Sequence, residues 1–237
     1  MSELFQAMAL PFTACLLLVG IHVYLGIHII ARKVIFVDLA LAQIAALGAI
    51  WGVLLGYGFH EDPWIVKAFS LLFTILGALL FSMTRPRDRR VPHEAIIGIT
   101  YAVALAATIL ASSHLPHGSD EIRDLLAGSI LWVEGHTLAI TGLLYLGIGG
   151  FHLLFRRQFF ELSFREEGLA GPLERERLWD FLFYFSFGLV VTSSVAIAGV
   201  LLVFSYLVIP ALIGVLLAPT LRARLAVGWG VGSLMSL

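Results

Sequence analysis

The sequence is poor in charge and nearly devoid of cysteine. Charged residues make up 13% of its 237 residues and hydrophobic residues 59%, and the mean hydropathy is +0.96. A soluble domain carries about a quarter charged residues, so this composition is typical of a polytopic membrane protein instead. Cys15 is the single cysteine, which excludes an internal disulfide. No basic segment precedes the first apolar run, so we expect no cleavable signal.

Motifs for nucleotide binding and catalysis are also missing. There is no Gly-x-x-x-x-Gly-Lys-Ser/Thr loop and no Gly-x-Ser-x-Gly turn. The His-Glu pairs at 60–61 and 93–94 lack the second histidine of a His-Glu-x-x-His zinc site, because Trp64 and Ile97 stand there. We therefore expect neither an enzyme nor a cofactor bound by this chain, and no nucleic-acid partner.

Long apolar runs are what the sequence has in abundance. A membrane-spanning helix needs about 20 residues. Runs of about that length lie at 8–31, 34–57, 64–83, 94–112, 137–155, 179–198 and 200–218. The last two belong to one uncharged stretch, 181–221, which as a single helix would be about 60 Å long, about twice the hydrocarbon thickness. We expect this stretch to cross twice and to turn within 193–199, with Gly199 and Pro210 allowing irregular backbone.

An eighth apolar run begins near Leu225 and ends at Leu237, which is too short for a span. We interpret the chain as truncated or as ending in an incomplete helix. The sequence thus predicts an all-α integral membrane protein, a polytopic bundle of about 7–8 transmembrane helices. Residues 1–237 would form one transmembrane domain.

Basic residues indicate the orientation. If the spans alternate, all 15 Lys and Arg residues except Lys67 and Arg123 fall on one side. The positive-inside rule makes that side cytoplasmic and places the N-terminus outside.

Two further segments have the pattern of short helices that do not span. Residues 119–131 form an external amphipathic pattern that begins with Ser119 as N-cap. On the cytoplasmic side, Ser163-Phe-Arg-Glu166 fits a capping box, and Gly171-Pro172 supplies a stop. We expect a helix of about two turns there, exposed to the cytoplasm.

Ionisable residues within spans suggest a pathway, because burying them in lipid is costly. Asp38 fits such a pathway, but it would equally suit the N-terminus of its helix or a pair with Arg32 or Lys33. His22 and His28 are each either ligands or hydrogen-bonded packing residues. We expect two others near span ends, His152 and Asp180, to be interfacial.

The external loops carry a second group of possible ligands. His114-x-x-His117 is followed by Asp120 and Glu121, and these residue types suit a transition metal. A solvated acidic loop is the alternative.

Four stretches, in order along the chain, resemble a known family. They are Phe-Val-Asp-Leu-Ala-Leu-Ala-Gln-Ile-Ala-Ala-Leu-Gly at 36–48, Glu-Ala-Ile-Ile-Gly-Ile-Thr-Tyr at 94–101, Leu-Ala-Gly-Ser-Ile-Leu at 126–131, and the segment 190–211 that ends in Leu-Val-Ile-Pro-Ala. Together they resemble the permease subunits of bacterial ATP-binding-cassette (ABC) importers for zinc, manganese or iron.

The resemblance implies a function and partners. The chain would be the permease of an ABC importer in the bacterial inner membrane, moving a divalent metal by ATP-driven alternating access. It would work as a homodimer with an ATPase subunit, which hydrolyses the ATP, and an external, periplasmic metal-binding protein. The family's coupling helix, which docks into the ATPase, would correspond to the segment with Ser163, Phe164, Glu166, Glu167 and Gly171. The family also has a complete eighth span.

One departure concerns the cargo. The family has an aspartate and, four residues on, a histidine in span two, and these positions are Leu39 and Gln43 here. The candidate metal-pathway residues are therefore Asp38, Gln43 and His22. A non-metal or metal-chelate cargo and a stand-alone secondary transporter are the alternatives.

Overall fold

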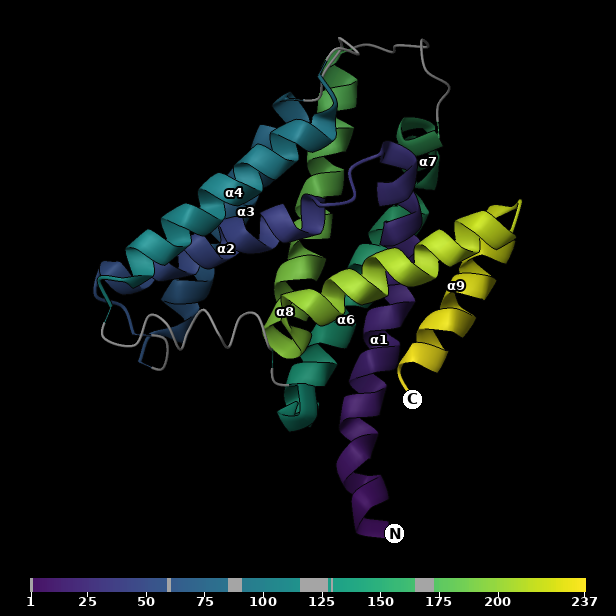
Figure 1. The fold of residues 1–237 in the computed structure, drawn as a ribbon, viewed down its shortest axis with the longest axis horizontal. Helices are drawn as coiled ribbons and strands as arrows, with labels where there is room; N and C mark the ends of the chain where they lie inside the picture. Colours follow the sequence, from purple (N-terminus) through teal and green to yellow (C-terminus); the bar gives the residue numbers. More distant parts are fainter. Residues whose placement is uncertain (1, 59–60, 85–90, 116–127, 129, 165–172) are drawn as a thin grey trace. The chain divides into compact units, whose positions relative to one another are not determined.

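The computed structural model describes residues 2–58, 61–84, 91–115, 128, 130–164 and 173–237. Within these ranges the chain is helical and has no strand, which confirms the predicted all-α class. The helices, shown in Figure 1, are α1 (Ser2–Arg32), α2 (Val37–Leu54), α3 (Pro63–Met83), α4 (His93–Ser112), the 3-10 turn η1 (Ile130–Trp132), α6 (Gly135–Leu154), α7 (Arg156–Phe164), α8 (Leu173–Leu217) and α9 (Leu221–Met235).

Six of the described helices are long and apolar enough to cross a membrane. Five of them, in α1, α2, α3, α4 and α6, match the predicted spans to within a few residues. The sixth, Arg175–Leu217 in α8, is 43 residues long and covers both of the last two predicted crossings. The chain is therefore a multi-pass helical membrane protein.

The first helix ends in a well-defined turn. Lys33 has a φ of 57°, in the left-handed region. Its N–H donates to the Ile30 carbonyl at 3.1 Å, and the N–H of Val34 donates to the Ile29 carbonyl at 3.2 Å. These two bonds form a Schellman motif, with lysine at the position that usually holds glycine. This turn delays the second helix to Val37, three residues after the predicted start at 34.

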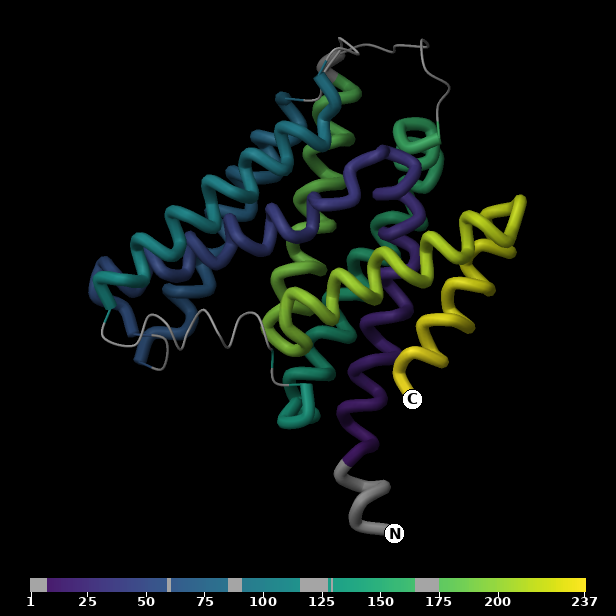
Figure 2. The backbone as a smooth tube through the Cα atoms, viewed as in Figure 1, coloured from purple at the N-terminus to yellow at the C-terminus, as the bar shows by residue number. Residues whose placement is uncertain are grey.

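The longest helix breaks where the sequence predicted a turn. Gly199 has φ 74° and ψ 161°, a conformation essentially restricted to glycine, and it is the one non-helical residue inside α8. The trace in Figure 2 changes direction there. Pro210, in contrast, stays within helical backbone, so the irregularity that we expected at this position is not present.

The helices form two compact units, each built from separate stretches of chain. Unit 1 comprises Met1–Ile35, Ala127–Phe164 and Ser193–Leu237, and unit 2 comprises Phe36–Leu126 and Arg165–Thr192. The first part of α8 therefore belongs to unit 2 and the remainder, with the break, to unit 1.

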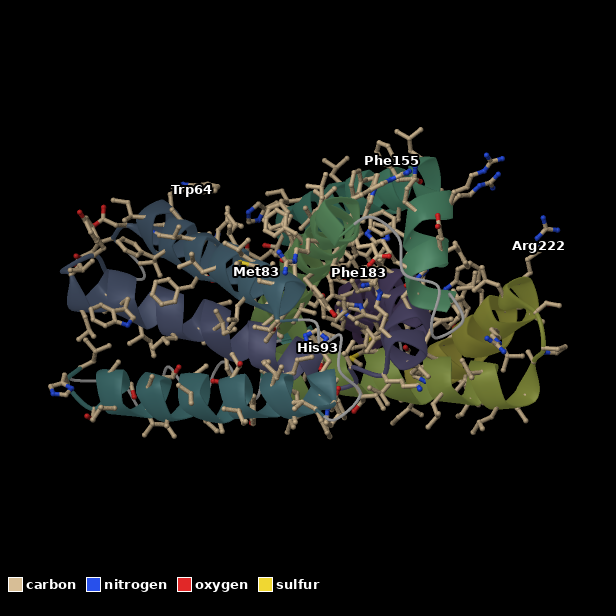
Figure 3. The ribbon with its side chains drawn as sticks, turned by 90° about the horizontal axis from the view of Figure 1, so that it is seen from above. Trp64, Met83, His93, Phe155, Phe183 and Arg222 are labelled. Carbon is tan, nitrogen blue, oxygen red and sulfur yellow. The ribbon has the colours of Figure 1, made fainter. Side chains whose placement is uncertain are left out.

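In unit 1, α1 contacts η1, α6, α7 and α9. Small residues bring some of these backbones close. Gly26 of α1 lies directly against Leu207 and Ala211 of α8. Gly232 of α9 lies against Val19, where an added Cβ would be 2.6 Å from the valine Cγ1. Arg222, at the start of α9, points away from the helix into the surroundings (Figure 3).

In unit 2, α2 lies between α3 and α4, and Figure 1 shows the three side by side. Glycine again sets the closest approach. A Cβ on Gly48 would be 2.6 Å from the Phe69 carbonyl oxygen and 2.7 Å from the Phe73 Cβ. Gly188 of α8 lies against Thr74 of α3. Trp64, at the start of α3, projects outward (Figure 3).

The predicted short helices fall mostly outside the described residues. Of the external segment 119–131, the structure describes Gly128 and the start of η1. Of the predicted coupling segment, it describes Ser163 and Phe164. The last helix begins at Leu221, earlier than the predicted 225, because the Thr220 side chain caps it by accepting from the Ala223 N–H at 3.4 Å.

Candidate functional site

Polar side chains are buried inside the apolar helices, where each needs a partner to offset its desolvation. Two groups of them lie in unit 1 along α1. We name them the outer cluster (His22, Ser194 and Tyr145) and the inner cluster (Tyr24, His28, Arg32, His152 and Ser163).

The outer cluster is a directed chain of hydrogen bonds. His22 Nδ1 lies 2.8 Å from the Leu18 carbonyl oxygen, which can only accept, so Nδ1 carries the proton and donates. Nε2 therefore accepts from the Ser194 hydroxyl at 3.2 Å. Ser194 in turn accepts from the Tyr145 hydroxyl. This chain connects α1, α6 and α8 a few residues before the break at Gly199.

These bonds bear on the two interpretations of His22. Both ring nitrogens are engaged and the side chain is buried, as the hydrogen-bonded packing interpretation expects. For His22 to bind a metal through Nε2, the bond to Ser194 would have to break.

The inner cluster joins α1 to α6 and α7. Ser163 Oγ lies 2.8 Å from His28 Nδ1 and accepts from Arg32 Nε at 2.9 Å. The Tyr24 hydroxyl lies 3.2 Å from His152 Nδ1. Helices α6 and α7, which lead into the predicted coupling segment, are thus bonded to the last three turns of α1.

Aromatic rings surround the same residues. The His152 ring stacks on Phe159 with centroids 4.1 Å apart. The edges of Phe160 and Phe164 meet His28 at centroid distances of 5.0 and 5.5 Å. All three phenylalanines belong to α7, so this short helix is packed through one face. Phe155, the single residue between α6 and α7, is labelled in Figure 3.

One sequence prediction is wrong here. Ser163 is helical and buried in the last turn of α7, so it does not cap a following helix; its hydroxyl serves His28 and Arg32 instead. His152, in the last turn of α6, and Asp180 are each 1% exposed, so other parts of the protein cover both side chains. Their place at the membrane interface stays a prediction.

Spacing contains a signal for the inner cluster that the sequence analysis missed. Tyr24, His28 and Arg32 recur every four residues, which places them on one face of α1. The pair considered above, His22 and His28, lies on different faces and in different clusters. A row of polar residues at i, i+4 and i+8 in an apolar span predicts a polar helix partner.

Asp38 and Gln43 lie in unit 2, and both are buried on α2. Asp38 stands in the first turn, as predicted, and its Oδ1 makes no hydrogen bond with the described residues. Beside it, Glu94 of α4 accepts from the Phe36 N–H at 2.9 Å and so caps the start of α2. His93, which follows Pro92 and is labelled in Figure 3, packs edge-on against Phe81 and Tyr184.

In the part of the chain that the structure describes, no three His, Cys, Asp or Glu side chains come together as a metal site. His114, one of the external candidates, is exposed and bonds the Leu110 carbonyl at 2.9 Å. The other predicted residues lie outside that part; they are His117, Asp120, Glu121, Glu166, Glu167 and Gly171.

The break in α8 has a close neighbour. Gly128 has a φ of 67°, and a Cβ there would overlap the backbone of Ala198 and Gly199. Two of the four family-like stretches, 126–131 and 190–211, therefore meet at this point. The other two, 36–48 and 94–101, meet through the bond from Phe36 to Glu94. The most distinctive stretches of the sequence thus pair within each unit.

Comparisons with known proteins agree with this architecture. The family model described as the ABC 3 transport family matches residues 4–237. A protein of Chlamydia pneumoniae named as a probable metal transport system membrane protein is 25% identical over 78% of this chain and 63% of its own length. One of the same name from Chlamydia muridarum is 25% identical over 78% of this chain and 62% of its own. The chain thus spans less than two thirds of these relatives.

A solved structure supports the fold. PsaBC from Streptococcus pneumoniae in complex with Fab has a TM-score of 0.72 with 20% identity, covering 98% of this chain and 80% of that one. A second structure, whose name gives a metal-chelate type of ABC transporter in an inward-facing conformation, has a TM-score of 0.68 with 18% identity over 99% of this chain and 78% of its own.

Proposed function

Since the chain belongs to the ABC 3 transport family, we propose that it is the membrane-spanning permease subunit of an ABC importer for a divalent metal cation. The family match over residues 4–237 carries this proposal, because it covers all of the described spans. The chain itself would perform no bond chemistry. Residues 1–237 would act as one permease domain in the bacterial inner membrane.

The proposed mechanism is alternating access. ATP binding would draw two ATPase subunits together, and their movement would open a pathway between two copies of this chain to one face and then to the other. An external binding protein would deliver the cargo. The break at Gly199 supports such a role, since irregular backbone at membrane depth occurs where it is enclosed by protein or lines a cavity.

Zinc, manganese and iron are the proposed cargo, and the names of the Chlamydia relatives support a metal. We propose Asp38 and Gln43 as pathway residues because both are buried and Asp38 Oδ1 has no hydrogen-bond partner among the described residues. His22 would join them by releasing Ser194. A metal chelate is the second candidate, favoured by Gln43, which is a weaker zinc ligand than a histidine.

Transport by the reconstituted complex tests the cargo. Vesicles that contain the full-length protein and its ATPase partner are loaded with a metal-sensitive dye and offered Zn²⁺, Mn²⁺ or Fe²⁺ with the external binding protein. We expect ATP-dependent entry of one of these metals. Normal ATP hydrolysis without metal entry would refute the metal cargo, and metal entry without ATP would indicate a secondary transporter.

Substitutions then test the pathway residues, one metal at a time. Asp38→Ala and Gln43→Ala should lower metal entry while the ATPase remains bound. Thr108→Ala is the matched control, because Thr108 is buried but its hydroxyl bonds the carbonyl of Ala104 in its own helix at 2.8 Å. Unchanged uptake by both pathway variants would remove these residues from the pathway.

Co-purification tests the proposed ATPase contact. Replacing Glu166 and Glu167 with Lys should release the ATPase if this segment docks into it. Glu61→Lys, on the predicted external side, is the control and should leave the ATPase bound. Equal binding by both variants would count against a coupling role for this segment.

A further inference from the structure

Helix α7 is attached to unit 1 at both of its ends. At its start, a single residue, Phe155, separates it from α6, which ends at Leu154. The Phe155 N–H donates to the Phe151 carbonyl at 3.1 Å, so the backbone remains hydrogen-bonded at this junction. At its end, Ser163 is bonded to α1. This nine-residue helix is therefore attached to its neighbours at both its first and its last turn.

The single hydroxyl of Ser163 makes hydrogen bonds with two side chains of α1. Its oxygen serves both His28 Nδ1 at 2.8 Å and Arg32 Nε at 2.9 Å, and Ser163 and His28 are buried. Hydrogen bonds from charged donors are the stronger kind, and burial strengthens them further. Phe160 and Phe164, which flank Ser163 in the sequence, both pack against the His28 ring. This packing limits the access of water to the hydrogen bond between His28 and Ser163.

The Ser163 contact lies where the first span and the predicted coupling segment meet. Ser163 and Phe164 are the last two residues of α7 and the first two of the predicted ATPase-coupling segment. Arg32 is the last residue of α1, the first span. One serine hydroxyl therefore joins the end of a membrane span to the start of the segment on which the ATPase would act.

We propose that Ser163 is a positioning residue that fixes α7, and with it the start of the coupling segment, to the cytoplasmic end of α1, so that the two helices move together. This inference rests on the proposed function, since it requires an ATPase that displaces the segment. It deepens that function by naming α1 as the first span to receive the movement and the hydroxyl of Ser163 as the group that transmits it.

An ordinary packing role makes a different prediction. If Ser163 served stability alone, Ser163→Ala would lower the amount of folded protein but leave the metal moved per ATP unchanged. If it transmits movement, the ATPase of Ser163→Ala still binds and hydrolyses ATP, while less of the displacement reaches α1. The ratio of metal entry to ATP hydrolysis separates the two roles.

The first experiment measures that ratio in vesicles containing the full-length protein and its ATPase, with Zn²⁺ and Mn²⁺ as probes. Losing the contact should lower the ratio in Ser163→Ala by at least about fivefold, the lower end of typical coupling between sites. Ser163→Thr, which keeps the hydroxyl, should restore it. Ser82→Ala is the matched control, because Ser82 is equally buried but bonds Leu79 O within its own helix at 2.8 Å. An unchanged ratio in Ser163→Ala would overturn the proposal.

The second experiment measures the attachment itself and needs no transported metal. Spin labels on Lys33→Cys and Arg157→Cys, both exposed positions of unit 1, report the distance between the end of α1 and α7 in a Cys15→Ser background. We expect one narrow distance, the same with and without a non-hydrolysable ATP analogue, and a broadened one in Ser163→Ala. If the distance changes on adding nucleotide in the protein that retains Ser163, the proposal is overturned. Failure of the proposed function shows differently, as no metal entry with the unmodified protein.

Discussion

Helices α1 and α2 are both apolar, buried spans, yet they contact their neighbours by different means. Helix α1 bonds α6, α7 and α8 through His22, His28 and Tyr24, and each bond has a donor, an acceptor and a direction. Helix α2 approaches α3 at Gly48, where the backbone of α3 lies so close that a side chain at this position would overlap it. These are the two general solutions for joining helices in lipid, where burial of apolar surface gives no driving force between them.

The two kinds of junction tolerate different substitutions. A glycine contact is steric, so it resists any added atom but needs no particular orientation of side chains. A hydrogen-bonded contact depends on both partners, so removing one leaves a buried polar group unsatisfied. Substitutions at each kind of junction should therefore fail in different ways.

The largest effect is expected at the glycine junction of α2. Gly48→Ala puts a Cβ against the Phe69 carbonyl oxygen and the Phe73 side chain, and backbone cannot move aside as a side-chain tip can. Overpacking of this kind costs about 1–3 kcal/mol, and the backbone contact favours the upper end. Thermal unfolding in detergent measures the loss. Gly150→Ala in α6 is the control, because nothing lies within 4 Å of its Cβ position. Equal losses for both variants would contradict a steric junction.

The next effect is expected in the outer cluster of α1. Ser194→Ala leaves His22 Nε2 and the Tyr145 hydroxyl without their partner, at a cost of about 1–3 kcal/mol. Ser112→Ala should cost less, since that buried hydroxyl bonds Ile109 in its own helix at 2.9 Å. A double-mutant cycle with Tyr145→Phe should show non-additive losses. Strict additivity would mean that the three side chains do not act as a chain.

A smaller loss is expected for Tyr24→Phe. The substitution removes the hydroxyl that bonds His152 Nδ1 but keeps the ring, which meets the His152 ring at a centroid distance of 5.6 Å. The expected cost is about 0.5–1.5 kcal/mol. Chemical unfolding of the variant, alone and combined with His152→Phe, checks the assignment: the double variant should be less destabilised than the sum. A loss as large as that of Ser194→Ala would mean that the ring contacts depend on the hydroxyl.

The smallest effect is expected for Ser205→Ala on α8. Its hydroxyl is exposed and bonds the Leu201 carbonyl of the same helix at 2.8 Å, so no junction between helices depends on it. The change in stability should lie within about 0.5 kcal/mol. A clear loss in thermal unfolding would show that exposed intrahelical bonds contribute as much as the bonds between helices, and the comparison would fail.

The spans and the break at Gly199 could be predicted, because each depends on local composition or on the conformational freedom of a single residue. The role of Ser163 could not. Ser-Phe-Arg-Glu reads locally as a capping box, yet the partners that determine the conformation of Ser163 are His28 and Arg32, more than a hundred positions earlier. The bond of His152 to Tyr24 joins residues that are also more than a hundred positions apart.

The amino-acid sequence alone is enough to show that this chain is a multi-pass helical protein. It also indicates where the spans lie and where the helix of the long apolar stretch is broken. Those features follow from hydrophobic length and from glycine, which act within a few residues. The tertiary structure alone decided which polar groups meet: His22 with Ser194, Ser163 with His28 and Arg32, and Gly128 with the break at Gly199. A buried polar group accepts any partner of the right chemistry, so its choice is made by the packing of helices that are distant in the chain.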